Sequence, residues 1–275
     1  MGVILEVLAG FAAGVLAGLT GVGGGVLLVP VLVAMGFPAL PAIGTSNFAI
    51  LISSTSGTVT NTLRFGLPWR RVLQIALPAV ILAPLGVWLA QQLPQQALFI
   101  AFAVFNLANI PLVGLRSGAA AKAAADSSAT EAIPEKAAPA AGSGTDSGAP
   151  PDVPNAFPKV VGTGAGAGVL AGLFGVGGGL VMVPMQVLLL STPVRLASRI
   201  SLAVVIFASI SAVVTHGLSS DDVNWRVGVL LAVGGLLGAP LGASLLHRIS
   251  DSAATRLFQV TMFAVAIYFI YKAFA

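Results

Sequence analysis

The stretch GVLAGLTGVGGGVLLVP at residues 14–30 returns as GVLAGLFGVGGGLVMVP at residues 168–184. The two copies differ only at Thr20/Phe174, Val26/Leu180, Leu27/Val181 and Leu28/Met182. The chain therefore contains an internal duplication. Each copy has a glycine cluster inside an apolar run, and glycine destabilises a helix interior by about 1 kcal/mol relative to alanine. We therefore expect a helix break at each GVGGG sequence.

The composition is that of an integral membrane protein. Hydrophobic residues make up 57% of the chain and charged residues only 8%, with a mean hydropathy of +0.99, whereas about 25% of a soluble domain is charged. The Lys and Arg residues are scattered between apolar segments and form no basic stripe, so we expect a lipid bilayer and no nucleic acid as partner. The absence of cysteine excludes disulfides, thiolate metal sites and cysteine chemistry. We expect no metal and no other cofactor.

The first apolar run, residues 2–35, is too long for a single membrane helix. A continuous helix of this length would measure about 50 Å, against a hydrocarbon core of about 30 Å. We predict a helical hairpin in which one helix ends near Leu19, the glycine turn lies inside the membrane and a second helix covers Val26–Met35. Residues 160–190 repeat this hairpin. A small-residue face that lets another helix approach closely is predicted at Gly10, Gly14 and Gly18, and again at Gly164, Gly168 and Gly172.

The chain divides into two membrane repeats and a linker, with about eight apolar segments in an all-α fold. Repeat 1 is predicted at residues 1–115 and repeat 2 at residues 159–275. Residues 116–158 are rich in Ala, Ser, Gly and Pro, which predicts a disordered linker. The segments after the hairpins are predicted at Ala42–Asn61, Val72–Ala90, Pro94–Leu115, Ala197–His216, Arg226–Leu246 and from Ala254 onwards.

The distribution of Lys and Arg predicts that the two repeats are inverted. If both repeats had the same orientation, nine of these residues would lie on one face of the membrane and four on the other. If a returning hairpin followed by three spans inverts the second repeat, the split becomes eleven against two. The positive-inside rule favours the larger asymmetry. We therefore predict inverted repeats, with the linker in the cytoplasm and both termini outside.

Inverted repeats would bring the two GVGGG turns together near the middle of the bilayer, where broken helices form the substrate sites of transporters. Each turn opens a helix, so unpaired backbone N–H groups and the positive end of the helix dipole point into it. A small oxyanion is the expected ligand. The alternative is that the glycines only permit tight helix packing. The predicted site glycines are Gly23, Gly24, Gly25, Gly177, Gly178 and Gly179.

Polar residues at the predicted start of the helix after the first hairpin form a second candidate group. Thr45, Ser46 and Asn47 could cap this helix or donate hydrogen bonds to the oxygens of an anion. The corresponding place in the second repeat reads Arg199, Ile200 and Ser201, of which only Ser201 keeps a matching polar side chain. We therefore include Ser201 in the site and expect the site to be asymmetric.

At these residues the chain resembles the TauE/SafE family of sulfite and organosulfonate exporters. The shared features are GVGGG followed by Val29-Pro30 and by Val183-Pro184, together with Ala-x-Gly-Thr-Ser at residues 42–46. The resemblance covers both repeats and stops at the linker. It implies a multi-pass permease of the bacterial cytoplasmic (inner) membrane that handles anions such as sulfite or sulfoacetate. The site residues that it marks are Gly23 to Gly25, Gly177 to Gly179, Thr45 and Ser46.

Export of a small anion is the function that we predict. Apart from Glu6, every Asp and Glu is expected in the linker or in loops, so no carboxylate relay for proton coupling is apparent. An anion that leaves a negative-inside cell gains about 2.3 kcal/mol per charge per 100 mV. The alternatives are a non-transporting membrane scaffold or assembly factor, and a permease for non-sulfur organic acids; an enzyme is not expected. A homo-oligomer is left open. Leucine at Gly24 or Gly178 is expected to stop transport while leaving the protein folded.

Overall fold

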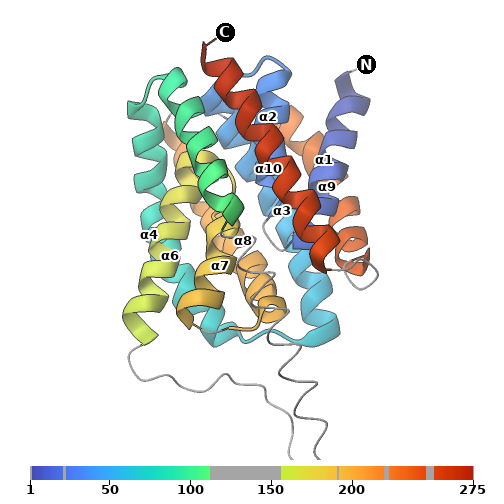
Figure 1. Ribbon diagram of the computed structural model, residues 1–275, viewed down its shortest axis with the longest axis vertical. Coiled ribbons are helices and arrows are strands. Elements are labelled where there is room, and N and C mark those ends of the chain that lie inside the picture. Colours follow the sequence, from blue (N-terminus) through green and yellow to red (C-terminus); the bar gives the residue numbers. More distant parts are fainter. Residues whose placement is uncertain are drawn as a thin grey trace, which may run out of the picture.

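The computed structural model shows a bundle of helices (Figure 1). It describes residues 2–20, 23–111, 156–190, 192–219, 223–245 and 251–274. The predicted all-α membrane fold is confirmed, because every regular element within these residues is a helix and several of them are strongly apolar. Within the described residues, the helices that are long and apolar enough to cross a membrane are Trp69–Gln92, Phe157–Phe174, Leu196–Leu218 and Trp225–Gly242.

Each repeat begins with the predicted helical hairpin. In the first repeat α1 (Gly2–Thr20) is followed by α2 (Gly25–Ala34), and in the second α6 (Ala156–Phe174) is followed by α7 (Gly179–Leu190). Both breaks fall in the GVGGG sequences. Gly24 and Gly178 have φ angles of +73° and +72°, which residues with a Cβ atom rarely adopt. The glycines thus end one helix and let the chain turn into the next.

Three further helices follow each hairpin, in the predicted order. In the first repeat they are α3 (Ala39–Phe65), α4 (Trp69–Gln92) and a helix over Gln95–Pro111 that carries no label in Figure 1. In the second repeat they are α8 (Val194–Ser219), α9 (Trp225–Leu245) and α10 (Asp251–Phe274). The predicted linker lies outside the described residues except for residues 156–158, which belong to α6.

The two repeats begin at opposite ends of the bundle (Figure 1). The start of α1 and the end of α10 lie at one end, which we call the termini end. The start of α6 and the connection from α3 to α4 lie at the other end, which we call the α6 end. Inverted repeats would give such an arrangement, and the orientation of the bundle in the membrane stays a prediction.

The first helix of each repeat packs against a helix of the other repeat. α1 lies on α9, and α6 lies on α4. Glycines permit these contacts: a Cβ atom at Gly14 would lie 2.6 Å from the carbonyl oxygen of Gly235, and one at Gly168 would clash with the carbonyl oxygen of Ala79. The predicted small-residue faces therefore bring helices into backbone contact. The glycines that do this are Gly10 and Gly14 on α1 and Gly164, Gly168 and Gly172 on α6.

α3 and α8 occupy the centre of the bundle. α3 contacts α2, α8 and α9, while α8 contacts α3, α4 and α7. α3 is the longest of the described helices at 27 residues, yet it is not among the candidate spans, since a row of hydroxyl side chains lowers its hydropathy. The most polar long helix therefore lies between the two hairpins.

Alanine at Gly168 is expected to destabilise the protein, because the added methyl group would overlap the backbone of Ala79 and force α6 away from α4. Overpacking of this kind costs about 1–3 kcal/mol, so the melting temperature of the detergent-purified protein should fall by several degrees. Gly166→Ala is the matched control on the same helix, because a Cβ atom there meets nothing within 4 Å. An equal fall in both variants would contradict this account of the α4–α6 contact.

Candidate functional site

The two glycine turns meet in the interior of the bundle. We call residues 23–25 the first elbow and residues 175–179 the second elbow, and all of these residues are buried. A Cβ atom at Gly25 would lie 2.6 Å from Cα of Val176 and 2.7 Å from the carbonyl oxygen of Gly175. The elbows are therefore in backbone contact, and the first residue of α2 lies against the turn that leads into α7.

Two apolar side chains of the central helices lie against both elbows. A Cβ atom at Gly23 would lie 3.4 Å from Cγ2 of Ile50 and 3.4 Å from Cγ1 of Val205. A Cβ atom at Gly177 would lie 2.8 Å from Cγ1 of Val205 and 3.1 Å from Cγ2 of Ile50. The two repeats thus contribute one side chain each, Ile50 from α3 and Val205 from α8, to the same place. Counting along the helices from this pair, Ser46 corresponds to Ser201 and Ser54 to Ser209.

Some of the predicted site glycines are needed for packing. A Cβ atom at Gly24 would lie 2.5 Å from the carbonyl oxygen of Ala13, and one at Gly178 would clash with that of Ala167. Gly25 lies against the second elbow, and Gly179 is the first residue of α7. The expectation that leucine at Gly24 or Gly178 leaves a folded protein is therefore wrong. Gly23 and Gly177 face the central helices, and a role for any of the six in binding stays a prediction.

The capping role predicted for Thr45, Ser46 and Asn47 is wrong. The helix begins earlier than predicted, at Ala39, and Pro38 occupies the cap position without a side-chain hydrogen bond. The three polar residues therefore lie beyond the first turn, where a side chain can no longer cap the free N–H groups. All three side chains are fully buried.

The three side chains instead bond to the backbone of the second repeat. The bonds are from Ser46 Oγ to the carbonyl oxygen of Gly175 (2.7 Å), from Asn47 Nδ2 to that of Ala171 (3.2 Å), and from the N–H of Asn224 to Thr45 Oγ1 (2.9 Å). Buried hydrogen bonds of this kind contribute about 1 kcal/mol each. They fasten the beginning of α3, at the termini end, to the second elbow, to α6 and to the start of α9.

The hydroxyl side chains of α3 and α8 fall into two groups. Most are bonded: Ser53, Thr55, Thr60 and Thr62 donate to carbonyl oxygens of α3 itself, Thr215 to one of α8, and Ser56 and Ser211 to carbonyl oxygens of α9 and α4. Four buried hydroxyls have no hydrogen-bond partner among the described residues: Ser54, Thr58, Ser201 and Ser209. An unpartnered buried donor costs about 1–3 kcal/mol. These four hydroxyls are therefore available to a ligand.

Ser54 and Ser209 lie next to the elbows, and we call them the central hydroxyl pair. Oγ of Ser54 lies 3.6 Å from the Cβ position at Gly23, and Oγ of Ser209 lies 3.6 Å from the Cβ position at Gly177. The first N–H groups of α2 and α7 have no partner within their helices, and helix N-termini attract anions. Each repeat thus places one unpartnered hydroxyl beside a glycine turn that leads into a helix N-terminus.

The central hydroxyl pair was missed as a site by the sequence reasoning. One signal was present: Ser46, Ile50 and Ser54 follow each other at intervals of four residues, and Ser201, Val205 and Ser209 repeat that spacing. Residues four apart lie on one face of a helix. Only the structure shows that these two faces are the ones that meet the elbows.

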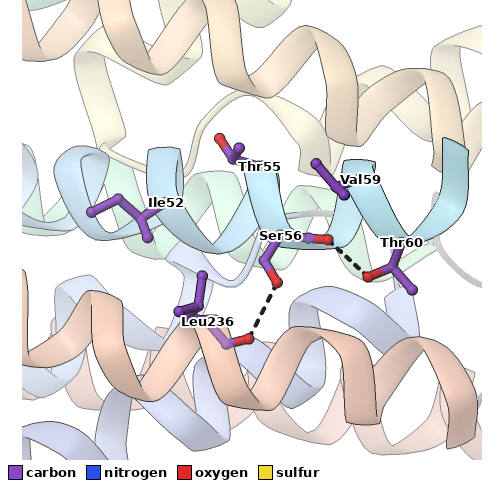
Figure 2. A pocket seen from close by; sticks show the side chains of 6 residues that line it. All are labelled: Ile52, Thr55, Ser56, Val59, Thr60 and Leu236. Carbon is purple, nitrogen blue, oxygen red and sulfur yellow. Dashed lines mark hydrogen bonds between the residues drawn. The ribbon is translucent and has the colours of Figure 1, made fainter. Parts of the chain in front are cut away.

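A surface groove between α3 and α9 has a different character (Figure 2). It measures about 420 Å³ and is lined by Ile52, Thr55, Ser56, Val59, Thr60 and Leu236. Figure 2 shows Ser56 donating to the carbonyl oxygen of Leu236 and Thr60 donating to that of Ser56. Thr55 donates to the carbonyl oxygen of Leu51. All the hydroxyls of this groove are occupied, so it offers an anion no hydroxyl donor.

An aromatic cluster covers the second elbow. Phe174 directly precedes this elbow, and its ring stacks on Phe105 at 4.7 Å and meets Phe102 edge-on at 5.5 Å. Phe102 also packs against Phe269 of α10 at 4.6 Å. The helix over Gln95–Pro111 therefore packs on the end of α6, directly before the second elbow, and α10 packs on that helix.

Comparisons with known proteins agree with this architecture. Residues 6–269 match the family described as sulfite exporter TauE/SafE. The chain belongs to this family. A probable membrane transporter protein of Xylella fastidiosa (strain Temecula1 / ATCC 700964) is 27% identical over 98% of this chain and 93% of its own length. The probable membrane transporter protein YunE of Bacillus subtilis (strain 168) is 25% identical over 99% of this chain and 98% of its own length.

TauE/SafE membership identifies the chain as a multi-pass membrane permease and not an enzyme. The resemblance noted at the GVGGG sequences is confirmed, and the match covers nearly the whole chain. The alternative of a non-transporting scaffold is set aside, because the relatives are named as transporters. No solved structure matches the chain significantly.

The bonded hydroxyl of Ser46 and the unpartnered hydroxyl of Ser54 lead to different predictions for the stability of the protein. Ser46→Ala removes a buried bond between the repeats and should lower the stability by about 1 kcal/mol, seen as a lower melting temperature. Ser54→Ala removes a hydroxyl that has no partner, so its melting temperature should stay equal to that of the wild type or rise slightly. A fall in Ser54→Ala as large as in Ser46→Ala would show that the Ser54 hydroxyl is bonded within the protein.

Proposed function

We propose that the protein exports a small oxyanion, sulfite or an organosulfonate such as sulfoacetate, through a site between the two elbows. The observation that carries this proposal is the central hydroxyl pair, two buried and unpartnered donors beside the starts of α2 and α7. The description of the family as sulfite exporters supports the substrate class. We place the protein in the bacterial cytoplasmic membrane, since the relatives found are bacterial.

Neutral donors suit a transported anion. α2 and α7 contain no Lys or Arg, so in this proposal hydroxyl groups, backbone N–H groups and helix dipoles hold the substrate. A site of this kind favours negative charge without a fixed counter-ion that would have to be separated from the substrate on release. Conduction needs binding that is strong enough to admit the ion and weak enough to let it leave.

The direction of transport follows from the charge of the substrate. The predicted topology puts the α6 end in the cytoplasm, where Arg70 and Arg71 begin α4. An anion that moves from that side to the outside is driven by the membrane potential, by about 2.3 kcal/mol per charge per 100 mV. α2, α3, α7 and α8 carry no carboxylate. In this proposal the protein therefore works as a facilitated exporter without a coupled proton.

Sulfite flux should depend on the central hydroxyl pair. Purified protein in proteoliposomes is expected to release preloaded sulfite and sulfoacetate under an imposed inside-negative potential, and to release acetate more slowly. Ser54→Ala combined with Ser209→Ala should lower the sulfite flux by about tenfold or more, because two hydrogen bonds to a charged ligand are lost.

Ser53→Ala is the matched control for this measurement, because its hydroxyl already donates to the carbonyl oxygen of Ile50. Wild-type flux is expected in that variant. Equal release of acetate and sulfite would count against the substrate class. Full sulfite flux in the Ser54→Ala/Ser209→Ala variant would count against the elbow site.

Ile50 and Val205 should limit the size of the substrate, because both touch both elbows. Trimming them to Ile50→Val and Val205→Ala should raise the ratio of sulfoacetate flux to sulfite flux by about tenfold, since a methylene group in a pocket is worth at least that in discrimination. Val204→Ala is the control, because this buried neighbour packs in a different cluster from Ile50 and Val205. An unchanged ratio would mean that the substrate does not pass between Ile50 and Val205.

A further inference from the structure

We propose that Thr58 and Ser201 form a second anion-binding position, between the elbows and the α6 end, which the substrate occupies before it reaches the elbows. We call these two residues the inner hydroxyl pair. The inference rests on the proposed function, because it assigns a further step to the same substrate. Four observations carry it: the register of α3 and α8, the free hydroxyls, the asymmetry of the two ends and the charge at the α6 end.

The register of the central helices puts the inner hydroxyl pair at one level of the bundle. Ile50 and Val205 meet at the elbows, and a Cβ atom at Gly57 would lie 3.6 Å from Cδ1 of Leu202. As α3 runs from residue 50 to residue 57, its contacts on α8 therefore move back from residue 205 to residue 202. Thr58 directly follows Gly57, and Ser201 directly precedes Leu202, so the two hydroxyls come from facing helices at the same height.

Both residues continue the faces that meet the elbows. Thr58 is four residues after Ser54, and Ser201 is four residues before Val205, so each lies one turn further along the same face. Thr58 is 4% exposed and Ser201 is fully buried. Neither hydroxyl has a hydrogen-bond partner among the described residues, although Thr55 and Thr62 on the same helix both bond to the carbonyl oxygen four residues before them. Thr58 and Ser201 thus share with Ser54 and Ser209 the lack of a partner that sets these four hydroxyls apart from the bonded ones.

The matching position on the other side of the elbows has no free hydroxyl. By the same count from Ile50 and Val205, the residues that correspond to Ser201 and Thr58 on the termini side are Ser46 on α3 and Val213 on α8. The hydroxyl of Ser46 is occupied by the carbonyl oxygen of Gly175 at 2.7 Å, and Val213 offers no donor. The further bonds of Thr45 and Asn47 to the second repeat hold this side together. Beyond the central hydroxyl pair, the unpartnered hydroxyls of α3 and α8 therefore continue towards the α6 end and not towards the termini end.

The α6 end is also the end where positive charge gathers. Arg70 is exposed at the start of α4. Arg199, near the start of α8, is half-buried, with its guanidinium 5.0 Å from the ring centre of Phe65 and with Nη1 3.5 Å from the carbonyl oxygen of Phe65. An anion drawn to these cations meets neutral donors next, first the inner hydroxyl pair and then the central pair. The ligand class is a small oxyanion with at least two oxygens free to accept hydrogen bonds.

The test compares two double variants in sulfite flux. Thr58→Val combined with Ser201→Ala removes the two hydroxyls with almost no change of volume, and we expect the flux from the α6 end to fall by about tenfold or more. Thermal stabilisation of the purified variant by sulfite, which reports binding at the elbows, should be retained. Ser53→Ala combined with Thr55→Val is the matched control, because both hydroxyls bond to their own helix. Thr58→Ser keeps the hydroxyl that Thr58→Val removes, so replacing valine by serine at residue 58 should restore the flux.

The outcomes separate this inference from the proposed function. Wild-type flux in Thr58→Val/Ser201→Ala would overturn the inner position and leave the elbow site intact. Loss of flux there, with full flux in Ser54→Ala/Ser209→Ala, would support the inner position and overturn the elbow site. Thr58→Val/Ser201→Ala could also lose both its sulfite flux and its thermal stabilisation by sulfite while the control keeps both. That result would show that the inner pair is itself the main site and would overturn its role as a preceding step.

Discussion

Backbone contact between the two elbows is the constraint on which the rest of the structure depends. Gly25 lies against Val176 and Gly175 with no space for a Cβ atom, so the start of α2 must lie close to the turn that leads into α7. Two helix beginnings carry partial positive charge, and in an apolar interior like charges at close range are costly. The arrangement becomes favourable when something negative or polar joins it. In the proposed function, the unpartnered hydroxyls of α3 and α8 and the transported anion supply this polar and negative partner, which would link the packing of the glycines to transport.

The predictable parts of this protein were those encoded by local patterns. A glycine cluster inside an apolar run marks a helix break wherever it occurs, and the repeated spacing of Gly164, Gly168 and Gly172 marks a close helix contact without information about the partner. The role of Ser46 was not predictable in this way, because its bond partner Gly175 is 129 residues away in the chain. The start of α3 also came earlier than predicted, at Ala39, since Pro38 is compatible with the position before a helix.

The roles of the hydroxyl groups could be assigned only from the structure, because each role depends on the direction in which the side chain points. A serine or threonine that faces lipid must bond to its own helix, since the hydrocarbon offers no partner. Thr55 follows that rule with the carbonyl oxygen of Leu51. Ser54, one residue before it, faces the elbows and does not. The sequence TSNFAILISSTSGTVTNT contains both kinds with no difference in composition, so only the geometry separates bonded from available donors.

The reciprocal packing of α1 on α9 and of α6 on α4 has a consequence for biogenesis. Ribosomes deliver the chain from its beginning, so α1 enters the bilayer long before α9 has been made. Until then its glycine face has only lipid against it, and α4 likewise waits for α6. Neither repeat covers these glycine-bearing faces by itself. A chain cut short before α9 would therefore present membrane quality control with uncovered helix-packing surfaces.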